Sequence, residues 1–191
     1  MIELVMTLTI VAVLAAVLSP LVLRYVDEAR VTRAAGEAES IAKAILAFYK
    51  DTGKWPIFQS GASITVTSST FQVLTGPGTY PVCGTDCTSD AWSPASGKTN
   101  PISDALELNA EGYTTVGKFA WRGPYVTNIG SDPWGNAYLV NGGSLAFGQN
   151  KAAFVLSAGA NAQIETSFSQ SIGSGSSAFA IGGDDIVARI R

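Results

Sequence analysis

The N-terminus contains the feature that most restricts the fold of this chain: one carboxylate, Glu3, followed by an uncharged apolar run over residues 4–23. A run of this length is what a helix needs to span about 30 Å of hydrocarbon. A carboxylate at the edge of such a segment is costly to desolvate and is by default a functional-site hypothesis. The alternative is that Glu3 lies at the level of the lipid headgroups and stabilises the positive end of the helix dipole.

The helical period continues beyond the apolar run. Apolar residues recur at steps of about three to four; they are Ala34, Ala38, Ile41, Ile45, Phe48 and Tyr49. Gly53 and Pro56 end the pattern. The sequence therefore predicts one helix of about fifty residues, roughly 75 Å long. Its apolar half, residues 1–24, projects from a globular head formed by residues 25–191, and its amphipathic half, residues 25–52, packs on that head.

Two further features concern this helix. Pro20 removes one backbone hydrogen bond and is expected to kink or loosen the preceding turn. No basic residue precedes the apolar run, which also continues directly into the amphipathic half. A cleaved signal peptide has the opposite properties. We therefore expect the run to remain in the mature protein.

Composition excludes several functions. The chain of 191 residues has a net charge of −3, and its 12 Lys and Arg residues are scattered, unlike those of nucleic-acid-binding proteins. Histidine is absent, which removes the commonest general base and the commonest metal ligand. No Gly-rich phosphate loop precedes a helix, and no convincing nucleophile is present. We therefore expect a protein that is not an enzyme.

Residues 57–118 are rich in Ser, Thr and Gly and predict a long surface loop, with a short helix over residues 103–111. The loop contains both cysteines, Cys83 and Cys87. A disulfide across this short spacing is the first interpretation and requires an oxidising compartment. The alternatives are two free thiols, or a zinc half-site that no second Cys or His pair completes.

The last third of the chain, residues 118–191, predicts an antiparallel sheet. Its strands are expected over residues 118–121, 137–140, 145–147, 153–157 and 186–190. Asn141-Gly142 is a hairpin turn signal. A long helix followed by such a sheet gives an α+β fold.

Five aromatic residues admit two interpretations. A ligand-binding platform is one, and core packing that fixes the sheet to the helix is the interpretation we favour. These residues are Trp55, Trp121, Tyr125, Trp134 and Tyr138.

The chain resembles the type IV pilin superfamily, and most closely the major pseudopilin of type II secretion systems. The resemblance covers roughly two-thirds of the chain and depends on the order and spacing of several short motifs. They are Ile2-Glu3-Leu4, Pro20, Val26–Arg30 (VDEAR), Ile41-Ala42, Ala47-Phe48-Tyr49, Gly53–Pro56 (GKWP), Trp121–Tyr125 (WRGPY), Asp132–Asn136 (DPWGN), Leu156–Gly159 (LSAG) and Asp184-Asp185-Ile186.

The resemblance implies the type IV pilin fold: a long N-terminal helix, a variable loop between helix and sheet, and an antiparallel sheet packed on the helix. It implies a subunit that polymerises with identical copies into a helical filament, either a secretion pseudopilus or a type IV pilus. A prepilin peptidase would remove a short leader, the new N-terminus would be methylated, and an inner-membrane platform would assemble the subunits. Glu3 matches the family glutamate that pairs with the terminal amine of a neighbouring subunit, and Pro20 matches the position around which the family helix often melts.

The chain departs from the family in three ways. Two residues normally precede the family motif that appears here as Ile2-Glu3-Leu4, so we expect that the first two mature residues and the leader are missing. A glycine often found within the apolar helix is absent. The loop over residues 57–118 is longer than in a typical major pseudopilin and carries an additional cysteine pair. A long surface pilus therefore remains an alternative to a secretion pseudopilus.

The resemblance also implies calcium as a cofactor, bound in the C-terminal loop. Asp184 and Asp185 match the acidic pair of the family, and Asn161 replaces a family aspartate. Oxygen ligands of this mixed kind suit Ca²⁺. The alternative is that the two aspartates are a solvated strand entry and that Asn161 is a turn residue.

Location and function have one competing hypothesis. A single-span membrane protein with a periplasmic binding domain that does not polymerise would also explain the apolar run and the cysteines. Arg24, Arg30 and Arg33 follow the span, and by positive-inside counting they would place the head in the cytoplasm. A missing basic leader would reverse that balance. We therefore expect the inner membrane before assembly, and a periplasmic or extracellular filament afterwards.

Overall fold

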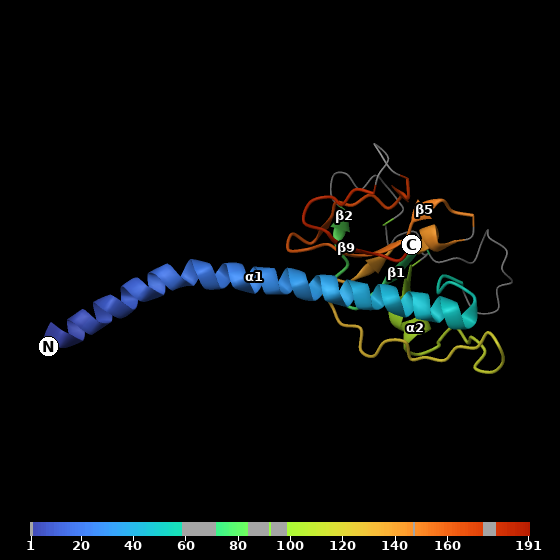
Figure 1. Cartoon of the computed structure of the whole chain (residues 1–191), viewed down its shortest axis with the longest axis horizontal. Helices are drawn as coiled ribbons and strands as arrows, with labels where there is room; N and C mark the ends of the chain where they lie inside the picture. The colour runs from blue at the N-terminus through green and yellow to red at the C-terminus, as the bar shows by residue number, and fades with distance from the viewer. Residues whose placement is uncertain (1, 59–71, 84–91, 93–98, 147, 174–178) are drawn as a thin grey trace.

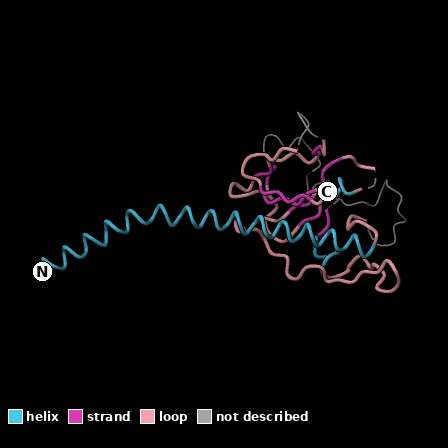
Figure 2. Tube along the Cα trace, viewed as in Figure 1, coloured by secondary structure: helices cyan, strands magenta, loops and turns pink. Residues whose placement is uncertain are grey.

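A long helix extends from one side of a globular head in the computed structural model (Figure 1). The structure describes residues 2–58, 72–83, 92, 99–146, 148–173 and 179–191. Helix α1 covers Ile2–Thr52 without a break, as the sequence predicted. It passes through position 20 as a continuous helix and bends smoothly over its N-terminal half (Figure 2).

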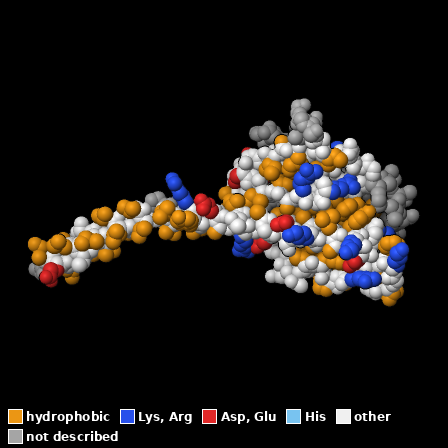
Figure 3. All heavy atoms as spheres, viewed as in Figure 1, with side chains coloured by type: hydrophobic (Ala, Val, Ile, Leu, Met, Phe, Trp, Pro, Cys, Tyr) orange, Lys and Arg blue, Asp and Glu red, His pale blue; other side chains and the backbone are white. Residues whose placement is uncertain are grey.

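The two halves of α1 differ in burial, and the boundary follows the sequence pattern. Before Ala34, every described side chain of the helix is exposed. From Ala34 onward one face is buried, and Ile45 and Phe48 are completely inaccessible to solvent. This helix therefore packs only through its last five turns or so. Its apolar half, residues 2–24, projects freely and is called the stem below. Figure 3 shows apolar side chains along the visible face of the stem.

Helix α1 ends just before Gly53, the glycine that the sequence indicated as its stop. The N–H of Gly53 donates to the carbonyl of Tyr49 over 2.8 Å, and Gly53 has a φ of +67°. Only glycine adopts this left-handed conformation without strain, so it closes the helix as a C-cap. The hydroxyl of Thr52 donates to the carbonyl of Phe48 over 2.8 Å and satisfies one terminal carbonyl.

The head contains a five-stranded sheet in the order β3-β1-β4-β6-β9. The strands are β1 (Val73–Thr75), β3 (Thr99–Pro101), β4 (Leu139–Val140), β6 (Phe154–Ser157) and β9 (Ile186–Arg189). Strand β1 pairs with β3 in parallel, and the other pairs are antiparallel. The strands of this sheet that lie within residues 118–191, β4, β6 and β9, pair antiparallel as predicted. The sheet as a whole is mixed, because β1 and β3 from the expected loop join it as a parallel pair.

The smaller elements surround this sheet. Two further sheets have two strands each, β2 with β7 and β5 with β8. These elements are β2 (Val82–Cys83), α2 (Ile102–Leu106), the 3₁₀ helix η2 (Gly142–Leu145), β5 (Lys151–Ala152), β7 (Gln163–Ile164) and β8 (Gln170–Ser171). Since β1, β2, β3 and α2 all belong to residues 57–118, the expected long loop contains part of the structured head.

The two faces of the sheet bury two apolar clusters. On one face, the amphipathic half of α1 packs against side chains such as Tyr138, Val140 and Val155. On the other, Leu139 and Leu156 contact Trp92 and the C-terminal loops. Neighbouring residues of β4 and β6 thus point to opposite faces, as strand geometry requires. The head forms one layer of helix on a sheet that is covered on its far side by loops.

Three predictions of local structure were wrong. Residues 118–121 are not a strand, because the indole N–H of Trp121 donates to the carbonyl of Ala105 over 2.8 Å and holds the segment as a loop on α2. Leu145 belongs to η2, and Phe147 lies outside the described residues. The signal at Asn141 is not a two-residue hairpin turn: this buried side chain accepts from the N–H of Phe154 over 2.7 Å and supports a longer connection.

Candidate functional site

The free stem contains the first group of candidate residues. Glu3 lies in the first turn of α1, and its side chain is exposed. Thr7 and Thr9 donate their hydroxyls to the carbonyls of Leu4 and Val5, over 3.0 and 2.6 Å. Their polar atoms are therefore satisfied within the helix. This leaves Glu3 as the one charge of the stem before Arg24.

Large apolar side chains are exposed along the whole stem. Ile2, Leu4 and Leu8 are 78%, 70% and 69% exposed. The helix is long and apolar enough to cross a membrane, judged by its length and composition. Burial of an exposed Leu or Ile side chain contributes about 1.5 to 3 kcal/mol. A stem with this surface requires cover, either by lipid or by other protein chains.

The backbone is helical at Pro20, and its side chain is outside the described part of the structure.

The second group lies where the stem enters the head. The C-terminal loops, at residues 159–166 and 180–185, run there beside the start of β9 (Figure 1). The carboxylate of Asp184 accepts from the backbone N–H groups of Ala160 and Asn161, over 2.8 and 3.2 Å. Two of the three predicted calcium ligands, Asn161 and Asp184, are therefore in direct contact although 23 residues separate them.

Asp185 lies in the same loop pair and faces inward. Its Oδ2 accepts from the backbone N–H groups of Glu165 and Thr166, over 2.9 and 2.6 Å. The residue is only 7% exposed, and its Oδ1 is buried and has no hydrogen-bond partner in the part of the chain that the structure describes. Burial raises the pKa of Asp185, and the two backbone donors only partly offset that effect.

Glu165 completes the cluster and was not identified from the sequence. Its Oε2 accepts from the side-chain amide of Asn161 over 3.1 Å and from the N–H of Asp184 over 3.3 Å. A Cβ atom on Gly182 would lie 2.3 Å from the backbone oxygen of Glu165, so the close approach of the two loops requires glycine there. The one sequence signal was the spacing of Glu165 from Asn161, four residues, combined with the later Gly182-Gly183 pair.

The cluster has the chemistry of a cation site in part. The carboxylates of Asp184, Asp185 and Glu165 all accept from backbone N–H groups of the same two loops, whereas the amide oxygen of Asn161 accepts from the N–H of Gln163. A buried carboxylate oxygen without a partner is costly unless a cation or water approaches it. Hard cations such as Ca²⁺ prefer these oxygen donors. Within the described ranges, however, no group of three or more Asp, Glu, His or Cys side chains has the spacing of a complete metal site. The cluster therefore fits calcium only with additional ligands, such as backbone carbonyls.

Cys83 ends strand β2 and is disulfide-bonded. Its predicted partner, Cys87, lies outside the described residues, so the pairing stays a prediction. The bond excludes Cys83 as a free thiol. Such a bond persists in oxidising compartments and is rare in the cytosol.

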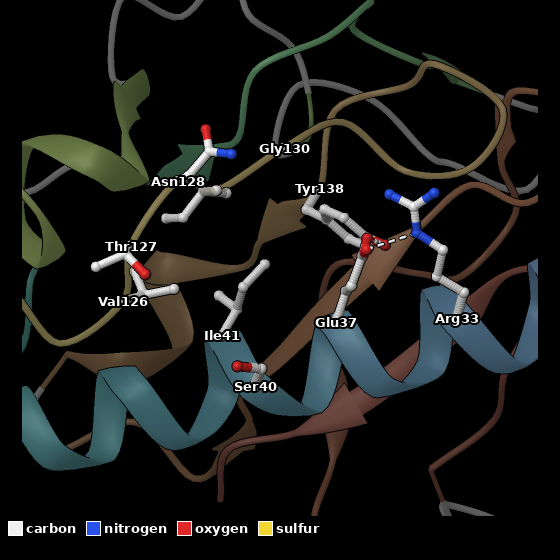
Figure 4. A pocket seen from close by; sticks show the side chains of 10 residues that line it. Arg33, Glu37, Ser40, Ile41, Val126, Thr127, Asn128, Gly130 and Tyr138 are labelled. Atoms are coloured by element: carbon white, nitrogen blue, oxygen red, sulfur yellow. Dashed lines mark hydrogen bonds and ion pairs between the residues drawn. The ribbon is translucent and has the colours of Figure 1, made fainter.

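A groove of about 330 Å³ separates α1 from the loop over residues 126–130 (Figure 4). The phenol of Tyr138 donates to Glu37 over 2.8 Å, and the guanidinium of Arg33 donates to the other oxygen of Glu37 over 2.7 Å. Burial and the Glu37 carboxylate raise the pKa of Tyr138. Arg33, Glu37 and Tyr138 therefore bind one another, and they attach the helix to the sheet.

The aromatic residues have the packing role that we favoured, with one exception. Trp55 and Tyr138 belong to the buried cluster between helix and sheet, and Trp121 and Tyr125 pack against it. Trp134 differs, because it is only partly buried and lines a hollow beside the stem.

Comparisons of the chain with protein-family models, with curated proteins and with solved structures found no match.

Proposed function

We propose that the chain is the structural subunit of a helical filament of the type IV kind, a pilus or a secretion pseudopilus. The observation that carries this proposal is the free stem: one apolar helix, exposed on every side, that continues without a joint into the packed helix of the head. A bundle of such stems buries their apolar surfaces against one another. The heads then form the outside of the filament.

Glu3 gives the assembly its register under this proposal. A carboxylate taken from the headgroup region into an apolar bundle needs a cation close by. The amine at the processed N-terminus of a neighbouring subunit is the partner that the family resemblance implies. Such a pair forms only when the neighbour has reached the correct axial position, because the attraction is strong only at short range in a low-dielectric surrounding.

The experiment compares the chain with Glu3→Ala and Glu3→Gln in cells that assemble the filament. Electron microscopy of the sheared cell surface and of the periplasm should show filaments for the unchanged chain. We expect at least a tenfold loss for both variants, since an unpaired buried charge costs about 3 to 5 kcal/mol. The head should melt at the same temperature in all three proteins. Equal filament yields for all three would overturn the role of Glu3, and a dispersed unchanged chain would overturn the filament.

A single-span anchor for a periplasmic domain is the second candidate. The length and composition of the stem favour it, since α1 passes the criteria for a membrane-spanning helix. This protein would remain monomeric in the membrane, and Glu3→Ala would be almost silent. Protease digestion of spheroplasts would place the head on the outer side of the membrane under both candidates. Cross-linking of native membranes separates them.

Calcium binding is the third part of the proposal. The support for it is the buried Oδ1 of Asp185, which has no hydrogen-bond partner among the described residues, in a loop pair where Asp184 and Glu165 also supply carboxylates. A bound Ca²⁺ would neutralise this charge and fix the two C-terminal loops against each other. Isothermal titration of the chain with calcium, with magnesium as the competitor, tests this directly. Binding that is unchanged in Asp185→Asn would place the ion elsewhere.

A further inference from the structure

The head has two surfaces at opposite ends that differ in charge: one is a cationic loop and the other is an acidic hollow. The first, the distal loop, covers residues 114–119 and lies beyond the C-terminal end of α1 (Figure 1). Val116 and Phe119 are 77% and 58% exposed, although both are apolar. Lys118 lies between them in sequence, and its ammonium is 5.5 Å from the centre of the Phe119 ring.

The distal loop is held in one conformation. The hydroxyl of Thr114 donates to the carbonyl of Val116 over 3.1 Å, and the N–H of Trp121 donates to the carbonyl of Thr114 over 2.7 Å. The Phe119 ring lies against Gly53, where an added Cβ would be 3.2 Å from the ring. The loop is therefore an ordered cationic and apolar projection. An ordered projection loses little conformational entropy when it binds.

The second surface, the stem hollow, lies where α1 leaves the head. It has a volume of about 370 Å³ and is lined by Asp27, Arg30, Val31, Trp134, Ala160 and Asp184. Its charged residues are two carboxylates and one guanidinium. Asp27 lies 3.6 Å from Arg30, whereas Asp184 forms no ion pair within the described part of the chain. The hollow is therefore acidic overall, with an apolar wall.

We infer that the distal loop of one copy binds in the stem hollow of the next copy along the filament. Phe119 and Val116 would cover Val31 and Trp134, and the ammonium of Lys118 would face Asp27 and Asp184. Neither surface is complementary to itself, because one is cationic and projecting and the other is acidic and concave. Two different surfaces that meet head to tail do not form a two-fold symmetric dimer; they generate an open helical chain of subunits when the rotation between copies does not close into a ring. This inference rests on the proposed filament and specifies which surfaces of the heads meet.

A pair of cysteines tests the contact. In Val31→Cys/Phe119→Cys, each copy carries one thiol in the hollow and one on the loop. Cys83 is disulfide-bonded and does not compete for them. Mild oxidation of sheared filaments should give a ladder of covalent dimers, trimers and longer products on a denaturing gel. Val31→Cys alone and Phe119→Cys alone are the controls, and neither should extend beyond dimers.

A charge reversal provides an independent measurement. Lys118→Glu should reduce the yield of filaments at low salt at least fivefold, and high salt should diminish the difference because exposed charges are screened. Lys151→Glu is the matched control, since it makes the same charge change on an exposed lysine of β5, outside both surfaces. The control should assemble like the unchanged chain.

Failure of the inferred contact and failure of the proposed filament give different results. Filaments that form normally but give no ladder, or only dimers, overturn the inferred contact and leave the filament intact. Equal effects of Lys118→Glu and Lys151→Glu also overturn it, because then only net charge matters. An unchanged chain that forms no filaments overturns the proposed function together with the contact.

Discussion

Individual residues show how polar groups in this protein are satisfied or left unsatisfied. Glu37 binds both Arg33 on its own helix and Tyr138 on the sheet, so one carboxylate joins two elements. Asp185, by contrast, has one satisfied oxygen and one without a partner. The first arrangement stabilises the head, and the second leaves a buried carboxylate oxygen uncompensated, which costs stability.

Tyr138→Phe should lower the free energy of unfolding by about 1 to 2 kcal/mol, because it removes a hydrogen bond to a charged group. Tyr113→Phe is the matched control: its phenol donates to a neutral carbonyl, that of Phe58, over 3.1 Å. This control should cost less. Urea denaturation of the detergent-solubilised chain measures both values. Equal costs for the two variants would show that Glu37 adds nothing beyond a neutral acceptor.

Asp185→Asn should change the dependence of stability on both pH and calcium. Because the folded state raises the pKa of Asp185, ionisation of this group favours unfolding. Its contribution to stability is therefore lost as pH rises through the window between the ordinary aspartate pKa and the raised value. The asparagine variant lacks this loss. Without calcium at neutral pH, we therefore expect its melting temperature to equal or exceed that of the unchanged chain.

The same two proteins, the unchanged chain and Asp185→Asn, also test calcium binding by the shift in melting temperature. At a concentration of 100 times Kd, a ligand of the folded state adds about 2.7 kcal/mol of stability. The unchanged chain should therefore melt at a higher temperature with calcium, and Asp185→Asn should show little or no shift. An equal calcium shift in both proteins would contradict the assigned ligand.

At the scale of elements, the two faces of the packed half of α1 have opposite environments, and only the buried face stabilises the head. Ile45 and Leu46 are neighbours with opposite environments, since Ile45 is fully buried and Leu46 is 41% exposed. Ile45→Ala should cost about 2 to 5 kcal/mol, because it leaves a cavity between helix and sheet. Leu46→Ala should cost less than about 1 kcal/mol. Thermal melts of both variants test the orientation of α1, and similar losses would contradict it.

The sequence predicted the elements whose own residues show a regular apolar periodicity. Helix α1 has a clear period over its amphipathic half, and β6 and β9 are apolar or alternating segments. Strands β1 and β3 have three residues each within a stretch rich in Ser, Thr and Gly, so only their sheet partners define them. Local patterns cannot reveal such elements, because tertiary pairing outweighs propensity there.

The candidate site was predictable to a similar extent. The spacing of Asp184 and Asp185 and their family resemblance located the C-terminal loop. Glu165 entered the cluster only because β7 and the start of β9 bring distant loops together. The hydrogen bond from Tyr138 to Glu37 spans 101 residues and had no local signal. Contacts of this kind depend on the completed fold.

At the scale of the whole molecule, the head should be independent of the stem. Of the side chains that the structure describes in residues 1–24, all are exposed, so removal of this segment takes nothing described from the core of the head. We therefore expect the remaining 25–191 to be monomeric in water, with a melting temperature within about 2 °C of the full chain in detergent, since surface changes usually alter stability by less than 0.5 kcal/mol. Size-exclusion chromatography and calorimetry test this. Aggregation, or a large drop in melting temperature, would show that the stem supports the head.

The continuity of α1 determines how a pulling force would travel through the protein. Tension applied at the stem runs along the helix axis and reaches the head as a sliding load, parallel to the face on which α1 lies. Side chains from Ala34 to Thr52 then resist together, instead of detaching one by one as in peeling. A subunit built in this way is strongest in the direction in which a long fibre is stretched.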